Sequence, residues 1–493
     1  MPHELDTCSA RVPGLFTHVL LACAICFLCA CAPGFQVVQS PSTAKVNSKG
    51  KPVSLQSRMQ RLLQEATIRF EAQDYKGVVE VLHRFLNRPN MPADQKVRAT
   101  FLVAEAAWQQ KQFLLAWPLY ESLTQQSASV KRQAELSEIA WVRLMQMADA
   151  LGQWQQVSSF YVAYAKQTQS IPNLLRYLQG KAAFHLGQNN QALQHLAAVA
   201  ETSVYFHRAR YLMGTIYVRL KNWRAAMGQF DQIVQHSRAG IHRAVHEKAL
   251  LALARLLYRQ GKWKEAITFY ERVAGDSSQY AWALYEQALA FHALGDEAAR
   301  GRQAGPARKH YTAAAGFLHK LQNGYPVEYK HPRVQILLAD IARKQGLRTR
   351  AQAIYEAVLN TYRPIYRNLA KASQQSIAVK QLRESRLFSP PAHIAGQYRA
   401  VQELQKGVGQ QSKKQVSPQY HKLLGRTRAI ERGVHMAWAP VLRRDLGRLL
   451  RWARVGMMHL QIADRKHWQR KMNAVQKQRA TAVQRSNNLF GEV

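Results

Sequence analysis

Apolar positions between residues 57 and 363 recur as pairs of amphipathic helices. In each pair the first helix has a small residue at its middle, and a Gly or polar turn follows it. An aromatic residue begins the second helix, and an Ala and a bulky residue follow at helical spacing. Such spacing turns one face of each helix toward a partner, so it predicts helical hairpins. Four stretches share the pattern most clearly: residues 101–120, 177–196, 211–230 and 251–270.

The small residues recur with a fixed period. The step from Gly180 to Gly214 is 34 residues, and so is the step from Ala254 to Ala288. Two antiparallel helices approach closely only where a Gly or Ala faces the partner, and the aromatic residue fills the space to the next hairpin. The clearest copies contain Gly214, Tyr217, Trp223, Ala226 and Phe230, then Ala254, Gly261, Trp263, Ala266 and Tyr270, then Gly180, Gly187, Ala192 and Leu196.

This pattern resembles the tetratricopeptide repeat (TPR). The resemblance implies an all-α, right-handed solenoid of about eight hairpins over residues 57–363, with weaker copies around Ala66, Ala104, Met145 and Ala339. Residues 272–295 and 351–364 are also loosely similar to the gliding-motility-associated TPR proteins of the bacterial envelope, which are thought to hold trans-envelope machines together. Generic hairpins without a regular superhelix are the alternative. Residues 300–306 are expected to form an inserted surface loop.

The last third of the chain departs from the repeat. Residues 364–423 are expected to be a linker with peripheral helices, the piece at 405–419 being linker by composition. Residues 424–493 predict a long, basic, amphipathic helical arm. It could cap the last repeats, lie on an anionic membrane, or dock a partner as a coiled coil. Its apolar stripe comprises Leu442, Leu446, Leu449, Ala453, Met457, Leu460, Trp468, Met472 and Val475.

All five cysteines lie within the first 31 residues. An apolar run from Val12 to Ala32 predicts a signal peptide at residues 1–30. It ends in Leu28-Cys29-Ala30-Cys31, which resembles the bacterial lipobox, so Cys31 is the expected lipidation site and residues 31–56 a flexible tether. Ala32 stands where an Asp would retain such a lipoprotein in the inner membrane, which favours the outer membrane. A lipobox ending at Cys23, an ordinary signal peptide and an uncleaved anchor are the alternatives.

The composition indicates an anionic partner and no catalytic chemistry. The 69 Lys and Arg exceed the 30 Asp and Glu by 39 charges, which attracts acidic protein, anionic lipid, acidic glycan or nucleic acid. Nucleic acid would require cytosolic residence, which the predicted signal peptide excludes. No phosphate-binding Gly loop, nucleophile elbow or zinc motif is present, and His242 with His246 lacks a third ligand. We therefore expect no enzyme, no cofactor and no metal.

The predicted function is that of a periplasm-facing scaffold lipoprotein. The resemblance implies a concave groove lined by the first helix of each hairpin, suited to an extended acidic segment of a protein partner. The alternative is charge-driven binding of peptidoglycan, lipopolysaccharide or anionic membrane, with possible regulation of cell-wall enzymes. The predicted groove residues are Tyr177, Lys181, Phe184, Arg208, Tyr211, Lys248, Leu251, Arg255, Tyr258, Trp282, Tyr285 and His292.

Overall fold

The computed structural model describes residues 55–86, 92–125, 131–168, 170–236, 242–385, 388–411 and 418–462, together with Gln476 and Gln478. Every regular element in these ranges is a helix. The predicted signal peptide, Cys31 and nearly all of the tether lie outside the described residues, as does most of the arm beyond Ile462. Among the helices that are described, none is both long and apolar enough to cross a membrane.

The chain divides into two compact units. The N-terminal unit spans residues 5–220 and 390–434, and the C-terminal unit spans residues 221–389 and 435–493 together with 1–4. Within the described residues, the helices of the N-terminal unit are α2 (Leu55–Glu71), α3 (Tyr75–Leu86), α4 (Ala93–Gln109), α5 (Phe113–Thr124), α6 (Lys131–Leu151), α7 (Trp154–Ala165), α8 (Asn173–His185), α9 (Asn189–Ala197), α10 (Phe206–Arg219) and α20 (Ala392–Gln411).

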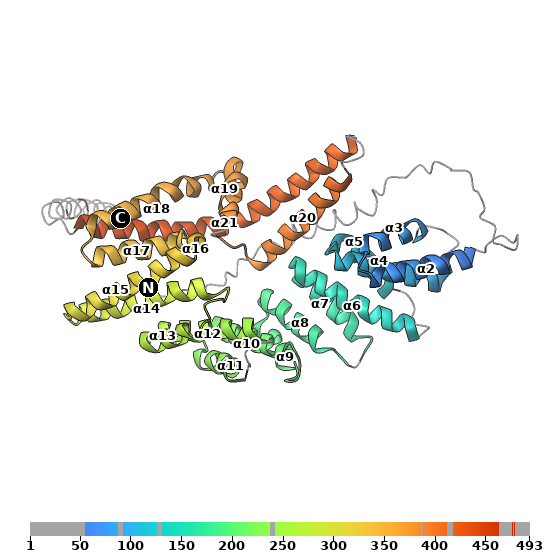
Figure 1. The fold of residues 1–493 in the computed structure, drawn as a ribbon, viewed down its shortest axis with the longest axis horizontal. Coiled ribbons are helices and arrows are strands. Elements are labelled where there is room, and N and C mark those ends of the chain that lie inside the picture. Colours follow the sequence, from blue (N-terminus) through green and yellow to red (C-terminus); the bar gives the residue numbers. More distant parts are fainter. Residues whose placement is uncertain are drawn as a thin grey trace, which may run out of the picture. The chain divides into compact units, whose positions relative to one another are not determined.

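The C-terminal unit contains a second series of helices (Figure 1). The last helix, α21 (Pro418–Ile462), belongs to the N-terminal unit up to Val434 and to the C-terminal unit from His435. The other helices are α11 (Trp223–His236), α12 (Arg243–Arg259), α13 (Trp263–Glu271), α14 (Tyr280–Arg300), α15 (Ala304–Gly324), α16 (Pro326–Tyr329), α17 (Pro332–Lys344), α18 (Arg348–Asn368) and α19 (Ala372–Glu384).

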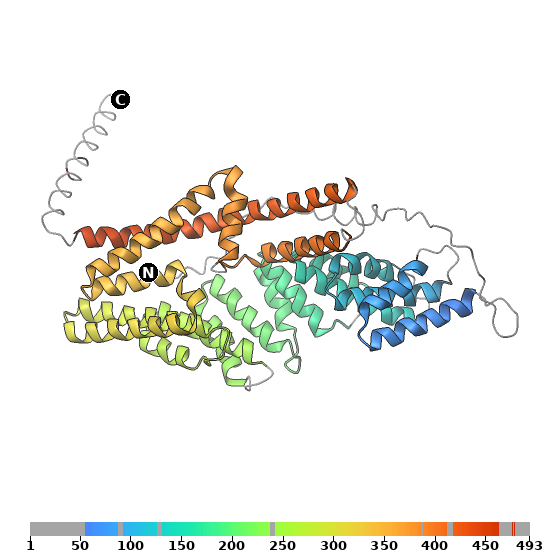
Figure 2. The same ribbon diagram turned by 45° about the horizontal axis from the view of Figure 1, so that its top comes forward.

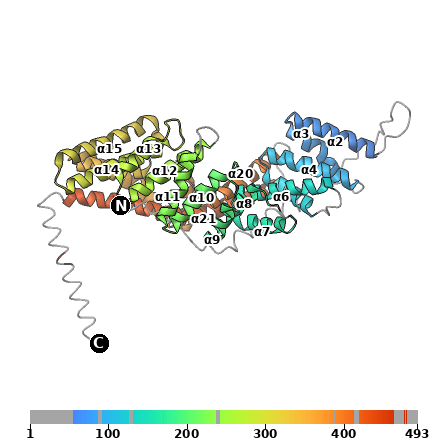
Figure 3. The same cartoon turned by 90° about the horizontal axis from the view of Figure 1, so that it is seen from below.

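Consecutive helices pack as hairpins, which confirms the all-α, helical-hairpin class predicted from the periodicity. In the N-terminal unit α2 packs on α3, α4 on α5, α6 on α7 and α8 on α9. In the C-terminal unit the same holds for α12 with α13, α14 with α15 and α17 with α18. The pairs α14/α15 and α12/α13 lie side by side in views taken at right angles (Figures 1 and 3).

A left-handed residue marks each turn between the two helices of a pair. Of the described residues, eight have a positive φ; seven lie in these turns, and the eighth, Lys221, lies in the connection between α10 and α11. Glycine occupies this conformation without steric cost, whereas other residues pay about 1–2 kcal/mol. Four of the eight are Gly152, Gly187, Gly261 and Gly346, which the sequence pattern includes, and four are Gln73, Lys111, Lys221 and Arg302, which it misses.

Small residues at the middle of the first helices allow close packing, as the sequence pattern predicts. A Cβ on Gly180 would lie 2.6 Å from Cγ of Leu196, so α8 and α9 fit only with glycine here. Ala254 and Ala288 of first helices are fully buried, and so are Ala226 and Ala266 of second helices. Each hairpin therefore closes on a small side chain and buries larger ones on either side of it.

The prediction of an inserted surface loop at residues 300–306 is wrong. Helix α14 ends at Arg300 and α15 begins at Ala304, so only three residues connect them. Both helices run for 21 residues, and the extra sequence lengthens the hairpin. Gly295 allows this, because a Cβ there would lie 2.5 Å from the ring of Tyr311. Arg302, at a φ of 57°, makes the tight turn.

Helix α20 returns to the N-terminal unit and packs on α5 and α6. A Cβ on Gly396 would lie only 2.0 Å from the carbonyl oxygen of Leu151, at the end of α6. Glu403 Oε2 accepts a hydrogen bond of 3.1 Å from the backbone N–H of Leu114 in the first turn of α5. Residues 405–411, expected in a linker, form the end of α20. Residues 412–417 lie outside the described part.

Helix α21 packs on the last repeat of the C-terminal unit. Cβ atoms on Gly456 and Gly447 would lie 2.2 Å and 3.0 Å from the rings of Tyr355 and Tyr366 of α18. The hydroxyl of Ser376 in α19 lies 2.6 Å from Nδ1 of His435. These contacts place α21 beside α18, which two views show (Figures 1 and 2). Among the predicted stripe residues, Leu442, Leu446, Leu449 and Ala453 are buried, so this stretch caps the repeats.

Candidate functional site

The predicted groove residues fall into two groups, one in each unit. Tyr177, Lys181 and Phe184 belong to α8, and Arg208 and Tyr211 belong to α10, in the N-terminal unit. Lys248, Leu251, Arg255 and Tyr258 belong to α12, and Trp282, Tyr285 and His292 to α14, in the C-terminal unit. All twelve therefore lie on first helices of hairpins, as the repeat frame predicts.

Three of the predicted groove residues are core residues. Phe184, Leu251 and Tyr285 are 7%, 1% and 5% exposed. Their side chains pack between consecutive hairpins, because a position facing the next first helix is covered once that helix is in place. No partner can reach these three side chains in the folded chain. Without these three, the remaining predicted groove positions are more polar than the full set suggested by the sequence.

In the N-terminal unit, an aromatic and basic cluster surrounds Tyr177. Its ring stacks on that of Tyr205 with centroids 5.7 Å apart. The guanidinium of the exposed Arg208 lies 6.0 Å from the centre of the Tyr205 ring. Burial raises the pKa of Tyr177, and the nearby carboxylate of Asp149 raises it further. The phenol therefore stays protonated at neutral pH and can only donate or accept hydrogen bonds.

Lys181 is paired with a carboxylate from the preceding repeat. Its Nζ lies 2.8 Å from Oδ1 of Asp149 on α6, and both side chains are less than one third exposed. The ammonium also lies 5.4 Å from the ring centre of Trp154. This lysine is therefore engaged within the protein, and it joins α8 to α6.

An ionic contact of the same kind joins α4 to α6. Glu105, on α4, is 6% exposed and receives hydrogen bonds from Arg143 Nε at 2.8 Å and Nη2 at 3.0 Å. It also accepts a bond of 2.7 Å from the hydroxyl of Tyr120 on α5. Burial raises the pKa of Tyr120, and Glu105 adds to this effect. One carboxylate thus ties three helices together.

In the C-terminal unit, Arg255 of α12 forms a bidentate ion pair with Glu286 of α14. The distances from Nε to the two carboxylate oxygens are 3.0 Å and 2.9 Å, and Nη2 lies 2.7 Å from Oε1. Burial raises the pKa of Tyr258, with Asp296 and Glu286 contributing. Two acidic residues therefore stand among side chains that looked purely aromatic and basic in the sequence.

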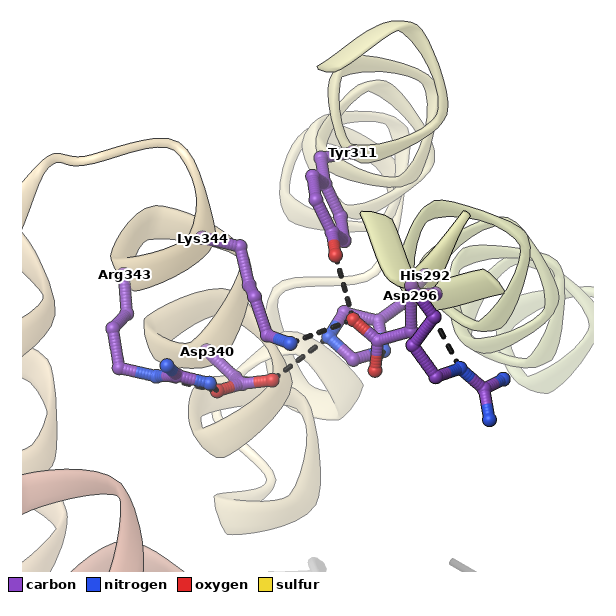
Figure 4. Close-up of polar contacts among 7 residues, drawn as sticks. His292, Asp296, Tyr311, Asp340, Arg343 and Lys344 are labelled. Atoms are coloured by element: carbon purple, nitrogen blue, oxygen red, sulfur yellow. Dashed lines mark hydrogen bonds and ion pairs between the residues drawn. The ribbon is translucent and has the colours of Figure 1, made fainter. Parts of the chain in front are cut away.

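The next two first helices, α14 and α17, meet at a polar cluster (Figure 4). His292 Nε2 lies 2.8 Å from Asp340 Oδ2, and Arg343 Nε donates to Asp340 Oδ1 at 2.8 Å. Burial would raise the pKa of Asp340, but the hydrogen bond to His292 and the charge of Arg343 lower it well below its usual range. Asp340 is therefore ionised at neutral pH, and it holds α17 against α14.

Asp296 forms the second half of this cluster. Its Oδ1 accepts hydrogen bonds from Lys344 Nζ at 2.7 Å and from the hydroxyl of Tyr311 on α15 at 2.6 Å. Burial opposes ionisation, yet the bonds from Lys344 and Tyr311 lower the pKa of Asp296. Two carboxylates, Asp296 and Asp340, thus face two cations, Lys344 and Arg343. The cluster has no excess charge from these four groups.

The contacts of His292 join helices. Among the described residues, the hydrogen-bond and ion-pair partners of its imidazole are Asp340 of α17 and Asp296 of its own helix. Within the described residues, no group of three or more His, Cys, Asp and Glu could hold a metal ion. The half-buried His246, whose pKa burial lowers, belongs to no such group among the described residues. The arrangement stabilises the stacking of repeats and leaves neighbouring side chains for binding.

Sequence reasoning missed the acidic partners because they lie one repeat away. Asp149 precedes Lys181 by 32 residues, Glu286 follows Arg255 by 31, and Asp340 follows His292 by 48. For Lys181 and Arg255, an acidic residue about one repeat period away along the sequence is the signal that indicates the ion pair. The third is hidden by the long α14/α15 hairpin.

One segment of the chain matches a known family model. Residues 249–277 match the tetratricopeptide repeat family model. The C-terminal part of a TPR repeat-containing protein from Cytophaga hutchinsonii is similar at 12% identity, covering 60% of this chain and 94% of that one, with a TM-score of 0.33. A tetratricopeptide repeat protein from Parabacteroides merdae is similar at 12% identity, 61% and 91% coverage and a TM-score of 0.29.

The apo form of the quorum sensor NprR from B. thuringiensis is also similar. It has 13% identity, covers 62% of this chain and 99% of its own length, and has a TM-score of 0.33. A search of curated protein sequences gives no match.

Proposed function

Since the chain is a TPR-repeat protein, a fold of protein–protein interaction, we propose that it is a non-enzymatic scaffold that binds protein partners in the bacterial envelope. In this proposal the protein is tethered by a lipid on Cys31, faces the periplasm and belongs to the outer membrane. It assembles or stabilises an envelope complex, such as an outer-membrane, secretion or motility machine.

The observation that carries the proposal is the character of the first-helix surface. Arg208 and Lys248 are exposed, and Tyr177, Tyr211 and Trp282 are half-buried. Aromatic side chains held by stacking and exposed cations are the residue types that dominate protein interfaces. The ion pairs behind them fix the helices, so these side chains are presented without a large ordering cost. Within each unit, an extended protein segment is the ligand that fits such positions on its successive first helices, α8 and α10 in one and α12 and α14 in the other.

The acidic character of the partner is supported by the overall charge. The chain has an excess of 39 positive charges, while the ion pairs along the first helices are balanced locally. A partner would therefore contact aromatic and isolated basic side chains in the groove and would be attracted by charge from the surrounding surface. Electrostatics would accelerate association, and apolar contacts would provide the part of the affinity that survives salt.

The lipid anchor rests on the sequence of residues 28–31, and it is tested by mass. Expression of the full chain in a bacterial host, followed by membrane fractionation and intact mass measurement, should give a mature species that begins at a diacylated Cys31. The Cys31→Ala variant should lose the lipid mass and the membrane association. The Cys23→Ala variant is the matched control, because Cys23 belongs to the weaker lipobox and should be removed with the signal peptide.

The alternative is that the charge itself binds peptidoglycan, lipopolysaccharide or anionic membrane. Salt distinguishes the two. Binding that depends on charge alone should fade steeply between low and moderate ionic strength, whereas groove binding should retain an apolar component. Loss of all captured protein at moderate salt would favour the alternative, and partners retained there would favour the scaffold.

A further inference from the structure

We propose that the solvent face of α21 in the C-terminal unit is a membrane-binding surface that lies on anionic phospholipid headgroups. The surface consists of Met436, Arg443, Arg444, Arg451, Arg454, Val455 and Met458, and we call it the α21 outer face. It adds a second membrane contact to the proposed lipid anchor, but it does not depend on that anchor.

The α21 outer face is one continuous stripe of a helix. At 3.6 residues per turn, its seven residues fall within a sector of about 120°, and Met436 and Met458 are about 33 Å apart along the axis. The opposite face is occupied, because Leu442, Leu446 and Leu449 are buried. The glycines of α21 contact the tyrosines of α18. Packing on the repeats therefore fixes which side of α21 faces outward.

The α21 outer face combines cations with exposed apolar side chains. Met436, Val455 and Met458 are 54%, 43% and 56% exposed, so an exposed apolar side chain stands at each end of the stripe. Apolar side chains that reach the headgroup boundary, surrounded by basic residues, are typical of helices that lie in a membrane interface.

The charge of this part of α21 has one sign. Residues 435–462 contain five arginines, no lysine and a single carboxylate, Asp445. Asp445 accepts from Arg448 at 2.7 Å and lies 3.6 Å from Arg444. The guanidinium of Arg443 lies 5.4 Å from the ring centre of Tyr366 on α18, so this exposed arginine stands at the edge of the face nearest α18. Arginine suits phosphate, because its planar fork makes two parallel hydrogen bonds.

The shape of the α21 outer face favours a membrane over an acidic protein. The face is the exposed stripe of one helix, and a flat surface of headgroups can contact successive turns of it at once. A protein would need an acidic strip of the same length with apolar pockets at both ends. Each arginine near an anionic surface contributes a similar attraction, so affinity should fall stepwise as arginines are removed.

Vesicle binding tests the surface. The full chain with Cys31→Ala, which carries no lipid, is sedimented with vesicles of phosphatidylglycerol and phosphatidylcholine in equal parts. The double variant Arg451→Gln with Arg454→Gln should bind about thirty-fold more weakly. The matched control is Arg308→Gln with Lys309→Gln, which removes two exposed charges of α15 in the same unit and should bind as before. Every form keeps the apolar run at residues 12–32, so its binding to vesicles of phosphatidylcholine alone is subtracted as the contribution of that run.

The apolar side chains are tested separately. The double variant Val455→Ser with Met458→Ser keeps every charge, and it should lose the binding that remains at moderate salt. Equal weakening by the α15 control would show that total charge, not this surface, attracts the vesicles, and would overturn the proposal. Undiminished binding by the Arg451 and Arg454 variant would overturn it too. Because the lipid is absent from all these proteins, neither outcome bears on the proposed anchor.

Discussion

Replacing Glu105 with alanine should loosen the first three hairpins more than any exposed charge reversal. The carboxylate accepts three hydrogen bonds, two from Arg143 and one from Tyr120. Its side chain is 8% exposed, and Tyr120 is fully buried. Alanine would leave the Tyr120 hydroxyl without this acceptor and the half-buried Arg143 guanidinium with its bond to Gln146 alone, and it would remove the ion pair between α4 and α6.

The magnitude follows from these contacts. Breaking a buried ion pair by removing one partner costs about 3–5 kcal/mol. The Arg143 side chain is 26% exposed, so water recovers part of its loss and about 3 kcal/mol is expected. Glu105→Gln keeps one acceptor and should cost about 1–2 kcal/mol. Asp94→Ala is the matched control on the same helix, since Asp94 is 65% exposed and its pair with Arg98 should contribute less than about 1 kcal/mol.

Hydrogen exchange measured by mass spectrometry on the full chain resolves this locally. At 1.4 kcal/mol for each factor of ten, Glu105→Ala should speed exchange of α4, α5 and α6 by about 100-fold. Exchange in α12 and α13 should not change, because repeats depend mainly on their neighbours. A change no larger than that of Asp94→Ala would refute the idea that inter-repeat ion pairs hold the groove together.

Three further perturbations test the fold. Gly261→Ala, at a φ of 79°, should lower the unfolding free energy of its hairpin by about 1–2 kcal/mol. Gly228→Ala, in open space within α11, should raise the unfolding free energy by up to about 1 kcal/mol. The denaturation midpoints of the two variants test both changes. Burial lowers the pKa of His331 to about 3, so the C-terminal unit should lose about 1.4 kcal/mol per pH unit below the unfolded pKa of about 6.5. His331→Asn, which keeps an N-cap acceptor for α17, should abolish that slope in acid titrations. Gly396→Ala should release α20 by clashing with the Leu151 carbonyl, seen as faster exchange in α20 alone; unchanged exchange would contradict the close approach.

The hairpins could be predicted because their signal is local. A Gly or Ala at the centre of the first helix, with an aromatic residue nine positions later, specifies both the close approach and the start of the second helix. Trp223 and Trp263 do begin α11 and α13. Turns in which a residue other than glycine has a positive φ could not be predicted from the sequence. Lys221 and Arg302 are such residues, and neither lysine nor arginine favours that conformation.

The candidate site was predicted less well than the fold. The frame placed all twelve residues on first helices, but three of them are buried and two of the basic ones, Lys181 and Arg255, are ion-paired. Pairing depends on residues a full repeat away, which periodicity alone does not reveal. The return of α20 onto α5 and α6, across 289 residues at the bond between Leu114 and Glu403, has no local signal either.

The central claim is that the first-helix surface binds a protein partner, and site-specific photo-crosslinking in the cells of origin tests it most directly. A crosslinking residue replaces Arg208 or Lys248 on first helices, and Arg224 or Lys264, equally exposed on second helices, serves as the matched control. The account predicts that Arg208 and Lys248 each give a discrete crosslinked species with one and the same partner protein, and that the control positions do not. Crosslinks of equal yield from both surfaces, or none from the first helices, would contradict it.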